Sequence, residues 1–154
     1  MSRMSLGGKI VQVVTNKTAT SGSTTSTIPQ DNTKPQNTEG ASCGLDTAIT
    51  PTDSNNKLVI FFQGAIDTDA GIGLVALFKD SDADALKAVI ANDYSTGAQA
   101  VNFIYEMTAG STSEITFKLR YGANSGTSYW LRESAGDRFN GVLTGEVVIF
   151  EVKP

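Results

Sequence analysis

Short extended segments alternate with turn-forming residues along most of this chain, and this pattern predicts an all-β fold. The clearest segment is 114–121, in which polar or charged residues alternate with Ile115, Phe117, Leu119 and Tyr121. Successive side chains of a strand point to opposite faces, so the alternation predicts one buried face and one face in water. A strand of this kind belongs to an antiparallel sheet whose other side is solvated.

Two further segments, 57–62 and 74–78, are apolar at both odd and even positions. This composition predicts strands that are covered on both faces, and 57–62 is the expected core strand. Residues 9–14 are largely β-branched and predict a first strand. A short extended segment at 45–50 is ended by Pro51.

The remaining segments complete a β-rich chain. Residues 82–92 fit either a strand or a single short helix, because their apolar residues match helical spacing over barely three turns. Alternate residues of 101–107 are apolar, and further extended segments lie at 127–132 and 142–153. Eight or nine strands, about ten residues apart, predict one antiparallel, jelly-roll-like β-sandwich.

A chain of 154 residues suits one domain. We expect a flexible N-terminal arm over residues 1–8 and a single β-sandwich over 9–154. Few aliphatic residues occur in 15–42, so this stretch is either a surface loop or a Thr-rich edge strand, around 17–27, that continues into a loop. Its second part, 28–42, is expected to form a long polar loop.

Composition argues against catalysis. The chain has no histidine and one cysteine, Cys43, so it lacks the commonest general base and metal ligand. We therefore expect no enzymatic activity and no cofactor. Twelve basic and 16 acidic side chains give a net charge of -4, and the basic residues are scattered, which argues against a nucleic-acid partner. No apolar run has the length of a signal peptide or a membrane span, so we expect no membrane partner.

Two short motifs match known functional patterns without their structural context. Residues 40–44 read Gly-x-Ser-x-Gly, but a nucleophile elbow needs a following helix and a histidine. The simpler interpretation is a strand entry flanked by glycines. Residues 71–76 fit a loose dinucleotide-binding pattern, but they run into an apolar segment and an acidic turn instead of a helix.

Acidic and aromatic residues raise two further alternatives. Two acidic turns contain Asp67 and Asp69, and Asp80, Asp82 and Asp84. Their carboxylates supply hard oxygen ligands for calcium if the two turns meet in space, and otherwise they are solvated. No EF-hand is present, and we expect no metal site. Tyr129 and Trp130 form a binding platform if exposed, or core packing if buried. No pair of glutamates stands out as catalytic among Glu106, Glu114, Glu133, Glu146 and Glu151.

Several segments together resemble a β-sandwich domain that is common in virion proteins of tailed phages. The similar segments are 8–14 (GKIVQVV) with the Thr/Ser-rich stretch after it, 45–51 (LDTAITP), 54–60 (SNNKLVI), 117–120 (FKLR), 124–127 (NSGT) and 148–154 (VIFEVKP). The resemblance spans nearly the whole chain and consists of strand and turn signatures. The stretch 28–42 is longer than expected for the family.

The resemblance implies a β-sandwich that trimerises on the outside of a virion, after assembly in the host cytoplasm. Only about eight residues precede the first strand. We therefore interpret the chain as a capsid decoration (cement) protein that contacts the major capsid protein and stabilises the shell. The leader and the 28–42 loop are the candidate partner-binding segments, with Arg3, Met4, Ile28, Pro29 and Pro35.

Two other functions fit the same resemblance. In the first, the domain belongs to a tail or head fibre and recognises a glycan on the host surface. In the other, which ranks behind both binding functions, the domain is a virion hydrolase that degrades a glycan. A decoration protein is expected to add to empty shells and raise their melting temperature, whereas an adhesin is expected to bind cells.

Overall fold

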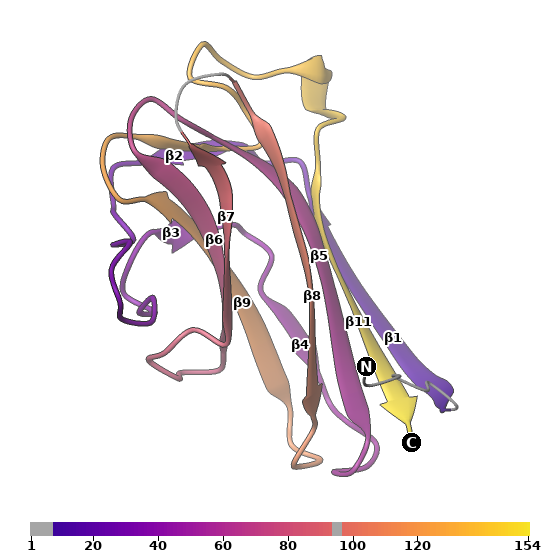
Figure 1. Ribbon diagram of the computed structural model, residues 1–154. Helices are drawn as coiled ribbons and strands as arrows, with labels where there is room; N and C mark the ends of the chain where they lie inside the picture. The colour runs from indigo at the N-terminus through magenta and orange to yellow at the C-terminus, as the bar shows by residue number, and fades with distance from the viewer. Residues whose placement is uncertain (1–7, 94–96) are drawn as a thin grey trace, which may run out of the picture.

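The computed structural model describes residues 8–93 and 97–154, which form eleven strands in two antiparallel sheets (Figure 1). The six-stranded sheet contains β1 (Lys9–Thr18), β2 (Gly22–Thr24), β5 (Lys57–Thr68), β8 (Gln99–Thr108), β10 (Ser128–Trp130) and β11 (Gly145–Lys153). The five-stranded sheet contains β3 (Ala41–Ser42), β4 (Thr47–Ile49), β6 (Ile72–Lys79), β7 (Lys87–Asp93) and β9 (Ile115–Ala123).

Strand order identifies the topology. In the first sheet β1 pairs with β11, β11 with β5, and β5 with β8. In the second sheet β4 pairs with β9, β9 with β6, and β6 with β7. These eight strands have the order of a double-sheet jelly roll, and β2, β3 and β10 extend it. The jelly-roll prediction is confirmed.

The core lies between the two sheets. In β9 the predicted alternation is confirmed, since Ile115, Phe117, Leu119 and Tyr121 are buried while the residues between them are partly exposed. The opposite sheet contributes Leu58, Ile60 and Phe62 of β5 and Val147 and Ile149 of β11. Complete burial of each such side chain contributes about 1.5 to 3 kcal/mol to folding.

Trp130 fills the centre of this core. Its ring stacks between Phe62, at a centroid distance of 6.0 Å, and Tyr121, at 5.9 Å. Gly64 and Gly145 make room for it, because a Cβ at either position would lie 2.2 Å and 2.5 Å, respectively, from an indole carbon. The two glycines therefore determine where the largest side chain of the core fits.

The stretch 82–92 is resolved in favour of a strand, β7, which pairs with β6. The edge-strand interpretation of 15–42 is also confirmed. The first strand continues to Thr18, and β2 then pairs with β10 before the chain enters a loop over residues 25–40.

This loop covers the outer face of the five-stranded sheet. Ile28 is completely buried and packs with Leu74, Ala76 and Phe78 of β6. Arg120 fixes the far end of the loop, since its Nε donates to the carbonyl of Glu39 at 2.6 Å and its Nη2 to that of Gly40 at 2.8 Å. The prediction that 74–78 is covered on both faces is therefore confirmed.

The corresponding prediction for 57–62 is wrong at one position. Leu58, Ile60 and Phe62 face the core, and Val59 is buried, but 40% of the Phe61 side chain is exposed. No segment of the described residues crosses the outer face of β5 as the 25–40 loop crosses that of β6. The apolar residues on this face are the starting point for the functional site.

A buried carboxylate fixes the end of the sandwich where β11 finishes. Glu151 is completely buried, and its Oε1 accepts hydrogen bonds from Asn56 Nδ2 at 2.6 Å, Thr52 N at 2.7 Å and Thr52 Oγ1 at 2.8 Å. Burial raises the pKa of Glu151, but the hydrogen bonds from Asn56 and Thr52 outweigh this effect and hold its pKa below the usual value. The turn between β4 and β5 is thereby tied to the last strand.

Gly64→Ala is expected to lower the free energy of unfolding by about 1 to 3 kcal/mol, because the added methyl group overlaps the indole of Trp130. Urea unfolding measures the change. In the Gly64→Ala/Trp130→Phe double variant the smaller ring leaves space, so the two effects are expected to be less than additive. Full additivity would contradict this packing.

Glu151→Gln is expected to remove about 1 to 2 kcal/mol of stability at pH 7. The pKa of Glu151 is lower in the folded than in the unfolded chain, so its contribution is complete above the unfolded value of about 4.3 and is lost as the pH falls through the folded pKa. Urea unfolding between pH 3 and 7 should show the wild-type and variant curves converging in acid. Curves that stay parallel would refute this role.

A candidate interaction surface on the six-stranded sheet

The outward side of the six-stranded sheet carries a cluster of apolar residues. We call this cluster the outer apolar face and define it as Val13, Val59, Phe61, Ile104, Val148 and Phe150. The strand register places them in two adjacent rows, because Phe150 lies opposite both Val13 and Val59, and Phe61 lies opposite both Val148 and Ile104. Residues opposite one another in paired strands share a face of the sheet.

Several of these side chains are open to solvent. The exposed fraction is 50% for Val13, 40% for Phe61 and 55% for Ile104. The rings of Phe61 and Phe150 meet edge to face at a centroid distance of 5.5 Å, which fixes both rings. Val148 and Phe150 between them are partly exposed and Val59 is buried. Exposed apolar patches are typical of sites of interaction with another molecule.

A groove of about 680 Å³ runs along this face. Its apolar lining includes Phe61, Ile104, Val148 and Phe150, and its polar lining is Gln63, Asn102 and Glu146. The amide of Gln63 donates to Glu146 Oε2 at 3.3 Å, which is the only hydrogen bond or ion pair of the Glu146 side chain within residues 8–93 and 97–154.

A second charged group lies near the other end of the face. Glu106 pairs with Lys57 at 3.8 Å through Oε1, whereas its Oε2 is buried without a hydrogen-bond partner in the described part of the chain. The two central rows of the outer apolar face contain no other charged side chain, so most of the face is uncharged.

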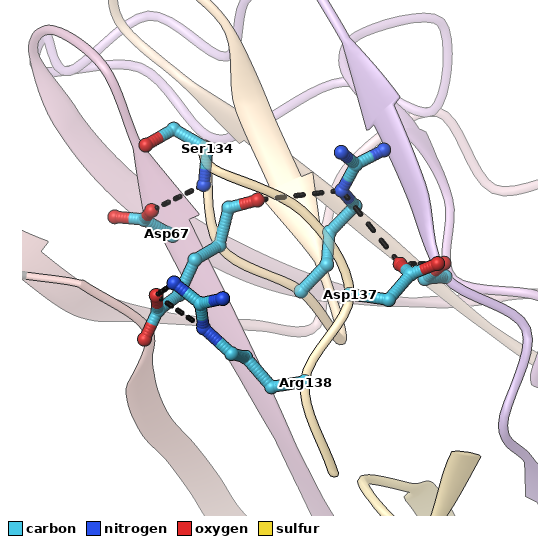
Figure 2. A network of polar contacts seen from close by, with 7 residues as sticks. Asp67, Ser134, Asp137 and Arg138 are labelled. Atoms are coloured by element: carbon cyan, nitrogen blue, oxygen red, sulfur yellow. Dashed lines mark hydrogen bonds and ion pairs between the residues drawn. The ribbon is translucent and has the colours of Figure 1, made fainter. Parts of the chain in front are cut away.

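A loop over residues 131–144 lies at the end of this sheet, in the orange to yellow part of Figure 1. Figure 2 shows the polar network that holds the loop. Buried Asp67 of β5 accepts a hydrogen bond from the Ser134 amide at 2.8 Å, and Glu133 pairs with Arg138. Asp137 accepts a hydrogen bond from Ser21 at 2.7 Å and pairs with Arg132 at 3.8 Å.

The tip of this loop is apolar. Phe139 is 72% exposed and Val142 is 77% exposed, and we call this pair the apolar tip. Phe139 (φ 56°) and Asn140 (φ 47°) have left-handed backbone conformations. This conformation is uncommon for a bulky residue, and it persists only where the surrounding structure enforces it. A hollow of about 500 Å³ lies between the loop and the sheet and shares Gln63 and Asn102 with the groove.

The partner-binding residues expected from the sequence lie elsewhere. Arg3 and Met4 fall outside the described residues. Ile28 of the 25–40 loop is completely buried against β6, so the prediction that it contacts a partner is wrong; it serves the loop's own packing. Pro29 is exposed and Pro35 is partly exposed, and their contact with a partner stays a prediction.

The cysteine in the 40–44 motif is part of the core. Cys43 is buried, and its burial raises the pKa of the thiol well above the ordinary value. Ser42 lies in β3, and its hydroxyl accepts a hydrogen bond from the amide of Gly44 at 3.0 Å. The strand-entry interpretation of this motif therefore agrees with the structure.

The two acidic turns considered for calcium do not meet, because they lie at opposite ends of β6. Asp69 accepts a hydrogen bond from the Thr127 amide at 2.6 Å, and Asp84 pairs with Lys34 at 3.1 Å. Within residues 8–93 and 97–154, no group of three or more acidic, cysteine or histidine side chains is placed to hold a metal ion. The alternative of a calcium site shared between the two turns is therefore wrong.

Tyr129 and Trp130 do not form a joint platform. Trp130 is buried in the core, and the guanidinium of Arg132 lies 5.7 Å from the centroid of the Tyr129 ring. Among the five glutamates, Glu133 holds the loop and Glu151 holds the end of the sandwich. In the part of the chain that is described, no helix is long and apolar enough to cross a membrane.

The outer apolar face was missed by the sequence analysis, although its signal was present. Apolar residues at both odd and even positions occur in 57–62, in 147–150 and in 10–14, which are neighbouring strands of one sheet. We interpreted the first of these runs as burial within the chain. The same signal arises when a second molecule covers the outward face.

Comparison with known proteins does not identify the chain. No family model and no curated protein matches it. Similar solved structures include Eiger TNF from S. frugiperda (TM-score 0.49, 10% identity, 92% of this chain and 93% of that chain) and PRD1 vertex protein P5 (0.46, 10%, 95% and 100%). The sugar-binding C-terminal domain of EclA has a TM-score of 0.41 at 12% identity, over 75% of this chain and 76% of that chain. At these TM-scores and sequence identities, the similar structures do not indicate a function for this chain.

Asp67→Ala is expected to loosen the 131–144 loop, because the amides of Ser134 and Thr68 lose their acceptor. Hydrogen exchange should become faster at the loop amides, and the free energy of unfolding should fall by about 1 to 2 kcal/mol. Asp31→Ala is a suitable control, since among the described residues Asp31 bonds only to Thr33 in an exposed turn. Unchanged exchange in the loop would contradict the role of Asp67.

Proposed function

We propose that this protein is a structural protein of a virion, a capsid decoration protein whose copies associate through the outer apolar face and stabilise the shell. The observation that carries the proposal is the contrast between the two sheets. The chain uses its own 25–40 loop to cover the apolar outer face of β6, and it leaves Val13, Phe61 and Ile104 open on the other sheet.

The energetics favour a covered face. Each half-exposed side chain of the patch offers on the order of 1 kcal/mol of further burial, so several together provide a useful contribution to association. Glu106 is the only charged side chain in the two rows of the outer apolar face. Because the rows hold so little charge, removing water from the face costs little free energy. Depletion of charge at the centre of a patch is a feature of protein interfaces.

The virion assignment rests on the resemblance of the sequence to sandwich domains of tailed-phage virions. We propose a homotrimer on the outer capsid surface that contacts the major capsid protein through segments outside the outer apolar face. We propose no reaction, because the chain has no histidine and its single cysteine is buried with a raised pKa.

Recognition of a host glycan is less well supported. Trp130 is buried, so it cannot form the sugar platform with Tyr129 that the sequence suggested. Glycan binding is therefore treated as an alternative outcome of the experiments.

Ile104→Glu is expected to convert the assembled protein to a monomer, because it places a charge on the outer apolar face directly beside Phe61. The matched control is Ile90→Glu, since Ile90 is 64% exposed on β7 of the other sheet. Sedimentation equilibrium should give the trimer mass for the wild type and the control. Ile104 is exposed, so both variants should keep wild-type stability within about 0.5 kcal/mol.

The same proteins test the virion role. The wild type and Ile90→Glu are expected to add to purified empty shells and raise their melting temperature, and Ile104→Glu is expected to do so weakly. A wild-type monomer at all concentrations, or binding to host glycans without any binding to shells, would overturn the proposal.

A further inference from the structure

The groove on the outer apolar face is not closed by the chain that forms it. None of its lining residues comes from the 131–144 loop, which lies beyond the upper ends of β8 and β11 in Figure 1 and shares a neighbouring hollow with this side of the sheet. Phe139 and Val142 line only the neighbouring hollow and keep most of their surface in solvent. One chain therefore displays an apolar groove and a separate apolar protrusion.

The protrusion is built to stay in place. Asp67 holds Ser134, Glu133 holds Arg138, and the backbones of Glu133 and Gly136 bond to each other in both directions. Phe139 is kept in a backbone conformation that a bulky residue rarely adopts. The contacts that hold the base of the loop lower the conformational entropy that the tip loses when it docks, which favours binding.

Charges beside the two features are complementary. Both contacts of Arg138 involve one oxygen of Glu133, so the guanidinium keeps further donors for another carboxylate next to Phe139. Glu146 at the groove accepts a hydrogen bond from Gln63 and forms no ion pair within residues 8–93 and 97–154, although Lys17 of β1 lies opposite it in the strand register. The tip therefore has a guanidinium with spare donors at its side, and the groove has a carboxylate that forms no ion pair in the described residues.

We infer that copies of this chain join head to tail, with Phe139 and Val142 of one copy seated in the Phe61, Ile104 and Phe150 groove of the next. Arg138 of the first copy then faces Glu146 of the second. This inference rests on the proposed association through the outer apolar face and names the segment that covers it. Because the two contacting surfaces differ, the contact is heterologous and closes into a ring when the rotation between copies permits.

Mixing two variants tests the inference. Phe139→Asn/Val142→Ser removes the apolar tip, and Ile104→Glu blocks the groove. Each variant alone is expected to be a monomer by sedimentation equilibrium. An equimolar mixture contains one intact tip and one intact groove, so it is expected to form a heterodimer of twice the monomer mass and nothing larger.

The asparagine substitution also controls for folding. Asparagine tolerates a left-handed backbone better than phenylalanine, so the tip variant is expected to be at least as stable as the wild type in urea unfolding while losing self-association. A tip of purely structural value would instead give a destabilised variant that still assembles. Glu146→Lys is expected to weaken assembly severalfold, and the Glu146→Gln control less so.

The outcomes separate the inference from the proposed function. If Ile104→Glu is a monomer but the tip variant still assembles like the wild type, the head-to-tail contact is wrong and association through the face stands. A mixture that stays monomeric also overturns the head-to-tail contact, since an isologous contact needs two intact copies. If the wild type itself never assembles, the proposed function fails.

Discussion

Every strand of a sandwich has two faces, and an apolar residue on either face needs a cover. The inner faces meet around Trp130, whose position depends on the space left at Gly64 and Gly145. The outer face of β6 is covered by the 25–40 loop through Ile28. The outer apolar face on the other sheet receives no such cover from the described residues. The account of function follows from this unequal covering.

Polar contacts at the ends of strands position the surfaces that remain. Glu151 ties the turn between β4 and β5 to the last strand, and Arg120 fixes the loop that carries Ile28. Asp67, buried at the far end of β5, orients the loop that displays Phe139. Each contact links residues distant in sequence. The jelly roll thereby presents a groove and an apolar tip on the same side of one sheet.

The fold was accessible from the sequence, because local alternation in 114–121 and regular turn spacing report directly on strands and their faces. The site was less accessible. The segments 57–62 and 74–78 are both apolar at odd and even positions, so they look alike in sequence. Only the path of the 25–40 loop shows that the outer face of 74–78 is covered and that of 57–62 is open at Phe61. The burial of Ile28 was missed because a single aliphatic residue in a polar stretch has no periodicity. The polar network around Asp67 joins residues that are far apart in the chain, so no local pattern announces it.

We propose that another copy of the chain covers the outer apolar face. The most direct test is the rate of thiol modification in an Ile104→Cys variant, since the native Cys43 is buried and contributes little background. The account predicts that modification slows severalfold as the protein concentration rises and the mass increases to that of the assembly. If the mass increases but the thiol is still modified as fast as an exposed thiol, the copies meet elsewhere, and another copy does not cover the outer apolar face.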